Sequence, residues 1–279
     1  MSNKKVLTIQ DISCYGQCST TVALPILSAF GHETAILPTG ILSTHTSGFT
    51  DYTFLDLTDE MPKIIEHWKS ERIKFDCIYT GYVANKAQFE YIKQCKEELL
   101  ADDGLFIVDP AMADNGQMYP GLDEEIIVGM MDICSIADYI LPNITEACFI
   151  THKEYQPIQD DSFINDLIAD LIALGAKNVI LTGYQDDEYS IGAVAYDGLT
   201  KTTILKQKED KSYHGTGDIF SSMVIGYLLN GKSIKEALDY STDFIIDAID
   251  NTVDDPFHDY GVKYEELLKD YIDKKDIRY

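Results

Sequence analysis

Short apolar runs rich in β-branched residues alternate with longer segments of helical periodicity, almost without a break to residue 183. An alternation of strand and helix is typical of a mainly parallel sheet with helices on both faces. The pattern therefore predicts an α/β fold. The expected strands are 5–10, 33–38, 76–80, 105–109, 139–141 and 178–182, and the expected helices are 20–30, 59–70, 86–100, 123–137, 161–174, 218–230, 233–251 and 264–273.

The pattern changes at residue 190, where SIGAVAYDGLTKTTILKQK contains two alternating segments around Asp197-Gly198. This dipeptide is favoured in tight hairpin turns. We expect an antiparallel hairpin at the edge of the sheet. Because no internal repeat, low-complexity tract or Pro/Gly/Ser-rich linker interrupts the 279 residues, a single domain over 1–279 is expected.

Polar residues follow six of the expected strands. In open α/β sheets, ligands bind beyond the carboxyl ends of the strands, so these residues are expected to converge on one edge of the sheet. They are Asp11 and Ser13, the loop 42–48, Gly81-Tyr82, Asp109-Pro110, 143–146 and Thr182-Gly183.

The charge balance restricts the partners. The chain has 47 acidic and 22 basic residues, a formal net charge of -25, which repels nucleic acid and anionic membranes. A phosphate ligand therefore needs backbone N–H groups, a metal ion or a few local cations. No apolar run of about 18 residues exists to span a bilayer, and MSNKKVLTIQDIS has no signal-peptide pattern, so a cytoplasmic protein is expected.

Six cysteines are scattered along the chain without a CxxC pair, which is typical of reduced and mostly buried thiols. Cys14 and Cys18 lie in a loop close to the expected site, and the sequence leaves their role open.

The segment HGTGDIFSSMVIGYLL has apolar residues at 219, 220, 223, 224, 227 and 228, the spacing of a buried helix that starts near Gly217. The first N–H groups of a helix have no intrahelical partners and carry partial positive charge. Gly215 and Gly217 leave room for an anion to approach them, so the segment predicts a phosphate cradle without a lysine. Asp218 either complements the helix dipole or acts as a general base toward an attacking hydroxyl.

HGTGDIFSS resembles the anion-hole motif of the ribokinase-like superfamily, and LTIQDISCYG, LSTHTSGF and YTGYVA resemble its vitamin B6 branch, the pyridoxal kinases. FIVDPAMADNG and LPNITEA match further motifs of that family, in the correct order over the whole chain. The resemblance implies a three-layer α/β/α fold. It also implies ATP-dependent phosphorylation of the 5′-hydroxymethyl group of pyridoxal, pyridoxamine or pyridoxine.

The resemblance further implies roles for individual residues. Asp218 would be the base, and the N–H groups of Gly215, Thr216 and Gly217 would hold the transferred phosphoryl group. Mg²⁺ would be supported by Glu146 and Asp109 with help from Asn143. The vitamer would be bound by Asp11, Ser13, Thr46 and Tyr82, and ATP by Asp109, Asn143, Glu146, Thr182, Thr203 and Lys206.

Some alternatives stay open. Asn143 with Glu146 three residues later is also a capping-box pattern, and Asp109 before Pro110 also suits a turn. Asp11 stands where many B6 kinases have serine, so its carboxylate could select the amine of pyridoxamine or a protonated pyridine nitrogen. A hydroxymethylpyrimidine kinase and a non-catalytic pyridoxal phosphate-binding protein are the alternative functions. A homodimer is implied by resemblance alone, and a need for K⁺ is left open.

Overall fold

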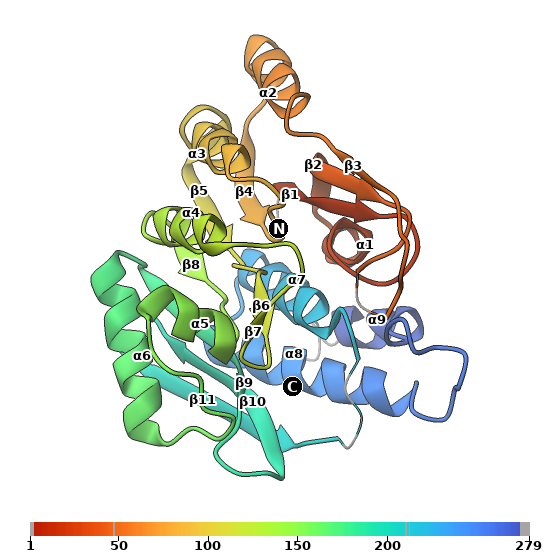
Figure 1. The fold of residues 1–279 in the computed structure, drawn as a ribbon, viewed down its shortest axis with the longest axis vertical. Coiled ribbons are helices and arrows are strands. Elements are labelled where there is room, and N and C mark those ends of the chain that lie inside the picture. The colour runs from red at the N-terminus through yellow and green to blue at the C-terminus, as the bar shows by residue number, and fades with distance from the viewer. Residues whose placement is uncertain (1–2, 47, 210, 212, 274–279) are drawn as a thin grey trace.

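The computed structural model describes residues 3–46, 48–209, 211 and 213–273. Within them, nine strands form one sheet at the centre of the molecule (Figure 1). The strands are β1 (Lys5–Ser13), β2 (Glu33–Leu42), β3 (Phe54–Asp56), β4 (Phe75–Thr80), β5 (Leu100–Val108), β8 (Tyr139–Ile140), β9 (Asn178–Tyr184), β10 (Ser190–Tyr196) and β11 (Lys201–Gln207). Two short strands, β6 (Ala113–Asp114) and β7 (Gln117–Met118), pair separately as an antiparallel ribbon.

The sheet order is β11-β10-β9-β8-β5-β4-β1-β2-β3. The six strands from β9 to β2 pair in parallel. Strands β10 and β11 form the expected antiparallel hairpin at one edge, and β3 pairs antiparallel with β2 at the other. Because β1 is buried along most of its length, its sequence is an apolar run rather than an alternating pattern, whereas β2 mixes buried and half-buried positions.

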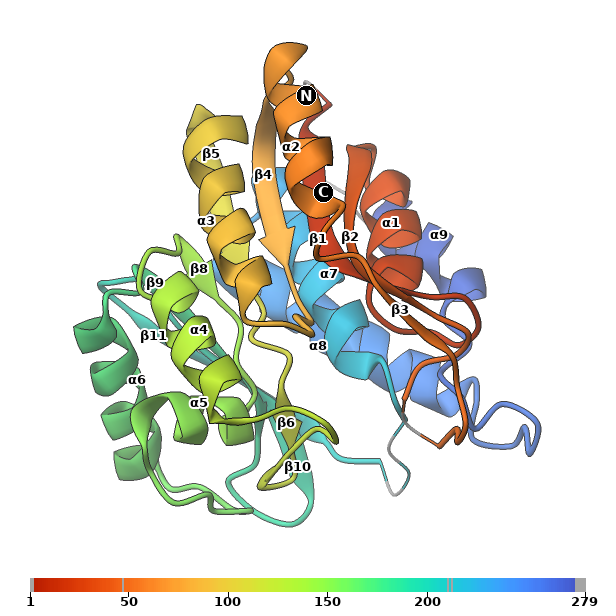
Figure 2. The same cartoon turned by 45° about the horizontal axis from the view of Figure 1, so that its top comes forward.

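Helices cover both faces of the sheet, as Figures 1 and 2 show. One apolar core joins the sheet to α2 (Met61–Ser70), α3 (Ala87–Leu99), α4 (Glu124–Cys134), α5 (Ile144–Thr151) and α6 (Asp161–Leu174). A second core lies under α1 (Thr20–Ala29), α7 (Thr216–Leu229), α8 (Ile234–Asp250) and α9 (Glu265–Asp273). The three-layer α/β/α architecture and the edge hairpin expected from the sequence are confirmed.

Candidate active site

The carboxyl ends of the six parallel strands lie along one edge of the sheet. This edge brings together the polar residues at the ends of β1, β2, β4, β5, β8 and β9, because parallel neighbours end on the same side. Asp11 and Ser13 lie within β1 and Thr182 within β9, not after these strands as expected, because both strands are longer than the apolar runs indicated. Helix α7 contacts α1 on one flank and α8 on the other.

The first turn of α7 is open to solvent. The helix begins at Thr216, one residue before the position expected from the apolar pattern, and Gly215 is its N-cap with φ of 79°. A Cβ on Gly215 would stand 1.7 Å from the carbonyl oxygen of Gln17, so only glycine fits there. Gly217 is exposed, and a Cβ on it would meet nothing within 4 Å. No side chain caps this helix, which leaves its first N–H groups accessible to an anion.

Asp218 lies in the same turn and is half-buried. Its Oδ2 accepts a hydrogen bond from the backbone N–H of Ser19 at 3.0 Å, which ties α7 to the start of α1. Burial and the neighbouring charge of Asp109 raise the pKa of Asp218 from 3.8 to about 7, and Asp11 adds to the shift. A carboxylate with a pKa near neutrality is well suited to accept a proton.

Asp109 follows β5 and is buried beside α7. Its Oδ2 accepts a hydrogen bond of 2.7 Å from the hydroxyl of Ser221, and burial raises its pKa to about 6. We did not single out Ser221 in the sequence. The signal for it was present, because Ser221 lies three residues after Asp218 and therefore on the same face of α7.

Asn143 and Glu146 form the capping box of α5. The Asn143 Oδ1 accepts from the Glu146 N–H at 2.9 Å, and the Glu146 Oε2 accepts from the Asn143 N–H at 2.8 Å. The amide nitrogen of Asn143 donates to the carbonyl of Ala113, and Glu146 Oε1 accepts from the Met112 N–H at 3.2 Å. The capping interpretation of this pair is confirmed.

Glu146 is also an electrostatic neighbour of Asp109. Burial, followed by the charge of Asp109, raises the pKa of Glu146 well above its ordinary value. Two buried carboxyl groups that repel each other would be relieved by a cation, and carboxylate oxygens are the ligands Mg²⁺ prefers. The chemistry of the pair therefore fits Mg²⁺, which these two carboxyl groups would hold. Among the described residues, no group of three or more His, Cys, Asp or Glu side chains is arranged to hold a metal by itself.

Three of the residues expected to bind the vitamer, Asp11, Ser13 and Tyr82, lie close together. The buried carboxyl of Asp11 accepts a hydrogen bond of 3.0 Å from the hydroxyl of Ser13, and burial raises its pKa. Tyr82 lies near Asp11. Its burial, followed by the charge of Asp11, raises the pKa of Tyr82 to about 12. His45 is close enough to lower the pKa of Asp11. Thr46 is exposed on the loop beside His45.

The residues expected to contact ATP are more dispersed. Thr182 lies beside Asn143, to which it is joined by a parallel bridge. On β11, Lys206 extends toward α8 and pairs with Asp239 at 2.8 Å and Asp243 at 3.0 Å. Thr203 is exposed and three residues away, so it lies on the opposite face of the strand. The structure therefore does not bring Thr203 and Lys206 together on one face of β11.

The thiol of Cys18 also lies at this site. Burial, followed by the charges of Asp218 and Asp11, raises its pKa well above the ordinary value. Cys18 is therefore a neutral thiol, while Cys14 is exposed.

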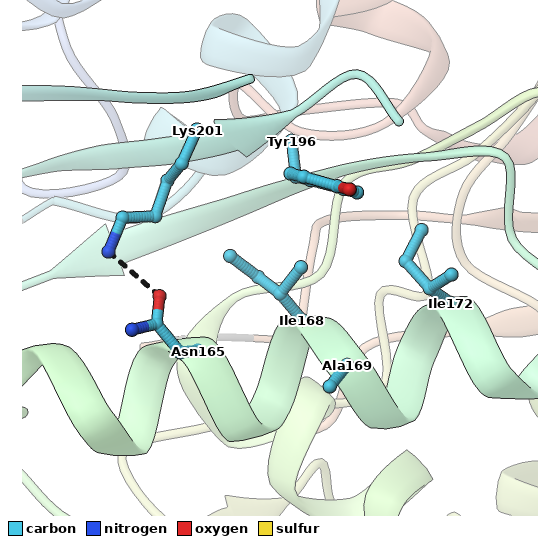
Figure 3. Close-up of a pocket in the computed structure, with 6 residues that line it drawn as sticks. All are labelled: Asn165, Ile168, Ala169, Ile172, Tyr196 and Lys201. Atoms are coloured by element: carbon cyan, nitrogen blue, oxygen red, sulfur yellow. Dashed lines mark hydrogen bonds between the residues drawn. The ribbon is translucent and has the colours of Figure 1, made fainter. Parts of the chain in front are cut away.

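A hollow of about 390 Å³ lies elsewhere, between α6 and the β10–β11 hairpin. Figure 3 shows its apolar wall of Ile168, Ile172 and Tyr196, and the hydrogen bond of 2.8 Å between Lys201 and Asn165. Asp161 also pairs with the Lys201 ammonium. None of the residues expected at the site lines this hollow.

The model of the phosphomethylpyrimidine kinase family matches residues 27–258. The chain belongs to this family. A crystal structure from Bacteroides thetaiotaomicron that contains pyridoxal is similar to the chain with a TM-score of 0.91 and 34% identity, over 97% of this chain and 96% of that one. Pyridoxal kinase from Lactobacillus plantarum is similar with a TM-score of 0.90 and 29% identity over the full length of both chains. A pyridoxal kinase of Dictyostelium discoideum is 25% identical over 85% of this chain and 80% of its own.

The family match confirms the resemblance to the B6 kinases of the ribokinase-like superfamily. The family is named for a kinase of phosphomethylpyrimidine, and the Lactobacillus plantarum and Dictyostelium discoideum relatives are named pyridoxal kinases. In the part of the chain that the structure describes, no helix combines the length and apolarity needed to cross a bilayer.

Proposed function

We propose that the chain is an ATP-dependent kinase that phosphorylates the 5′-hydroxymethyl group of pyridoxal, pyridoxamine or pyridoxine. The observation that carries the proposal is the placement of Asp218, with its pKa near 7, in the same turn as the open amides of α7. A base and an anion site in one helical turn suit transfer of a phosphoryl group to a hydroxyl. A protein that only stores pyridoxal phosphate has no use for such a base.

The reaction needs little covalent chemistry from the protein. The hydroxyl oxygen of the vitamer attacks the γ-phosphorus, its proton passes to the Asp218 carboxylate, and ADP leaves. The N–H groups of Gly215, Thr216 and Gly217 hold the phosphoryl oxygens while negative charge spreads over them. Asp109 and Glu146 would hold Mg²⁺, which would neutralise charge on the phosphates. Asn143 fixes Glu146 through the capping box.

The vitamer binds near Asp11, on the side of Asp218 away from Asp109 and Glu146. Asp11 and Ser13 face its polar substituents, and Tyr82 and Thr46 border the ring. A buried carboxyl at position 11 favours a vitamer that carries a positive charge, because such a partner offsets the cost of burying the charge. Thr182 and the β10–β11 hairpin, with Thr203 or Lys206, border ATP.

We further propose a cytoplasmic homodimer. Support comes from the family alone, and sedimentation velocity tests the dimer directly. A species at the mass of two 31.4 kDa chains at micromolar concentration is expected, whereas a single species at one chain mass excludes it.

The function is tested by ADP release with MgATP and each candidate substrate at equal concentration. We expect turnover with at least one B6 vitamer to exceed turnover with hydroxymethylpyrimidine by tenfold or more. Turnover confined to the pyrimidine would replace the B6 assignment with the alternative in thiamin synthesis. Tight pyridoxal binding without ADP release would identify a binding protein instead.

Asp218→Asn tests the base. The amide keeps the size of the side chain and can still accept the Ser19 hydrogen bond, but it cannot accept a proton. We expect kcat to fall by about 10²-fold or more while the dissociation constant of MgATP changes by less than about threefold. Ser221→Ala is the matched control on the same face of α7, and a smaller loss is expected for it. Near-normal turnover of Asp218→Asn contradicts the role of the base.

A further inference from the structure

The segment between α8 and α9 touches three loops at the rim of the candidate site. We call residues 255–261 the strap. In Figure 1 the blue connection from α8 to α9 carries it beside the loops at the ends of β1 and β2. The base of this connection is fixed, since the Lys263 N–H donates to the buried hydroxyl of Thr252 at 2.8 Å and Val262 is fully buried. The strap is therefore presented to the site from a rigid base.

The first contact is with the loop after β2, through His45. The His45 Nε2 lies 2.9 Å from the carbonyl oxygen of Tyr260. Because a carbonyl oxygen can only accept, Nε2 carries the hydrogen in this bond. The ring of His45 also covers Gly16, where a Cβ would stand 2.1 Å from Cδ2, and packs edge-on against Phe49 with ring centres 5.0 Å apart. His45 is buried, and its position beside Asp11 is set in part by the strap.

The second contact is with the loop between β1 and α1. The ring of Tyr260 packs on that of Tyr15 with ring centres 4.9 Å apart, and on that of His258 with ring centres 4.4 Å apart. One residue later, a Cβ on Gly261 would stand 2.6 Å from Oε1 of Gln17. The backbone carbonyl of Gln17 is the atom that faces Gly215 in the anion-binding turn. The strap therefore also supports the loop that borders the first turn of α7.

The third contact is an ion pair of 2.9 Å between Asp259 and Lys211, which precedes the anion-binding turn. The Lys211 side chain is 40% exposed and that of Asp259 74% exposed, so solvent and salt screen this pair. The hydrogen bond to His45 and the ring contacts of Tyr260 are the stronger part of the attachment.

We propose that Tyr260 is a positioning residue for the vitamer: through its carbonyl and its ring, the strap holds His45 and the β1–α1 loop in the geometry that binds the vitamer. This inference rests on the proposed function. It concerns the vitamer end of the site, because the strap contacts His45 and the β1–α1 loop, whereas the side-chain hydrogen bonds of Asp109, Asn143 and Glu146 go to Ser221, Ala113, Met112 and one another. Loss of the ring should therefore weaken vitamer binding and leave ATP binding unchanged.

The test compares three variants in steady-state kinetics with the vitamer and MgATP varied separately. In Tyr260→Ala we expect KM for the vitamer to rise by about fivefold or more, with KM for ATP and the thermal midpoint nearly unchanged. Tyr260→Phe keeps both ring contacts and removes only the hydroxyl, which interacts with Tyr15, so its vitamer KM should stay close to that of the parent protein. Phe257→Ala is the matched control, since it removes an aromatic ring that is 88% exposed from the same strap. An unchanged vitamer KM in Tyr260→Ala, or an equal rise in both KM values, overturns the proposal.

A second readout separates this inference from the proposed function. Amide hydrogen exchange of residues 43–46 and 14–18 is measured in the same variants without substrate. Faster exchange in Tyr260→Ala, with Tyr260→Phe and Phe257→Ala unchanged, supports the strap even if no vitamer is phosphorylated. Exchange that is equal in all three variants overturns the strap, whatever the enzyme assay shows.

Discussion

The site contains four carboxyl groups whose pKa values are raised by burial, and they are neighbours of one another. Asp11 and Asp109 both act on Asp218, and Asp109 also acts on Glu146. Burying several like charges together is unfavourable for the fold, and such a cost is common where ligands carry the compensating charge. The sequence motif identified Asp218 and the glycines around it. It did not identify Ser221 or the strap contact of His45, because both depend on which helix and loop lie opposite.

The raised pKa of Asp218 predicts the pH dependence of the reaction. The base must be ionised, so kcat/KM should fall as the pH drops through about 7, with a slope of one on a logarithmic plot. The measurement is a pH–rate profile from pH 5.5 to 9 at constant ionic strength. A flat profile down to pH 5.5 contradicts the assignment of Asp218 as the base.

The same shift predicts a stability effect of opposite sign to that of a salt-bridged aspartate. The folded pKa lies above the ordinary 3.8, so ionised Asp218 lowers the free energy of unfolding above about pH 7, and this penalty disappears as the pH falls toward 4. Asp218→Asn should therefore be more stable than the parent protein at pH 8, and equally stable near pH 4. We expect a gain of about 1 to 2 kcal/mol in the free energy of unfolding at pH 8, which is less than the full pKa shift implies because the side chain is partly hydrated. Urea unfolding at both pH values checks this. Equal stability at pH 8 contradicts the unfavourable environment of the carboxylate.

At the scale of elements, the sequence predicted helices with strong apolar periodicity but did not predict the short elements. Helix α6 has the bounds 161–174 expected from the sequence, because Asp160 caps its start and Gly175 follows its end. Helix α5 has only eight residues, six of them buried, so it has no amphipathic period to recognise. Strand β3 was also missed, since its three residues are all exposed and pair only with β2.

The first turn of α7 predicts different outcomes for its two glycines. Gly215 has φ of 79° and faces the Gln17 carbonyl at a built Cβ distance of 1.7 Å, so Gly215→Ala should lower both stability and activity. Gly217→Ala should keep or raise the thermal midpoint, because the site is open and alanine favours helix. Its methyl group enters the space of the anion, so kcat/KM should still fall by about tenfold or more. Full activity of Gly217→Ala contradicts the anion site.

At the scale of the whole molecule, the parallel topology explains why residues from 11 to 218 meet at one edge, and the alternation of strands and helices was enough to predict it. The strand order and the choice of loop partners were not predictable, because they depend on packing between distant segments. The charge of -25 is a second global property. It forces anion binding to rely on backbone amides and on a cation.

This charge predicts an unusual salt dependence for nucleotide binding. Added salt screens the repulsion between the protein and ADP, so affinity at saturating Mg²⁺ should stay constant or improve, by up to about threefold, between 20 and 200 mM tetramethylammonium chloride. That salt avoids any specific effect of K⁺. Isothermal titration calorimetry gives the dissociation constants. A several-fold loss of affinity would indicate a cationic nucleotide site instead.

The most direct test of the account is a crystal structure with Mg²⁺, a non-hydrolysable ATP analogue and pyridoxal. We expect the terminal phosphoryl oxygens within about 3.2 Å of the N–H groups of residues 215–217, and the 5′-hydroxyl oxygen within hydrogen-bonding distance of Asp218. A terminal phosphate bound away from the start of α7, or a 5′-hydroxyl about 5 Å or more from Asp218 in the closed complex, would contradict it.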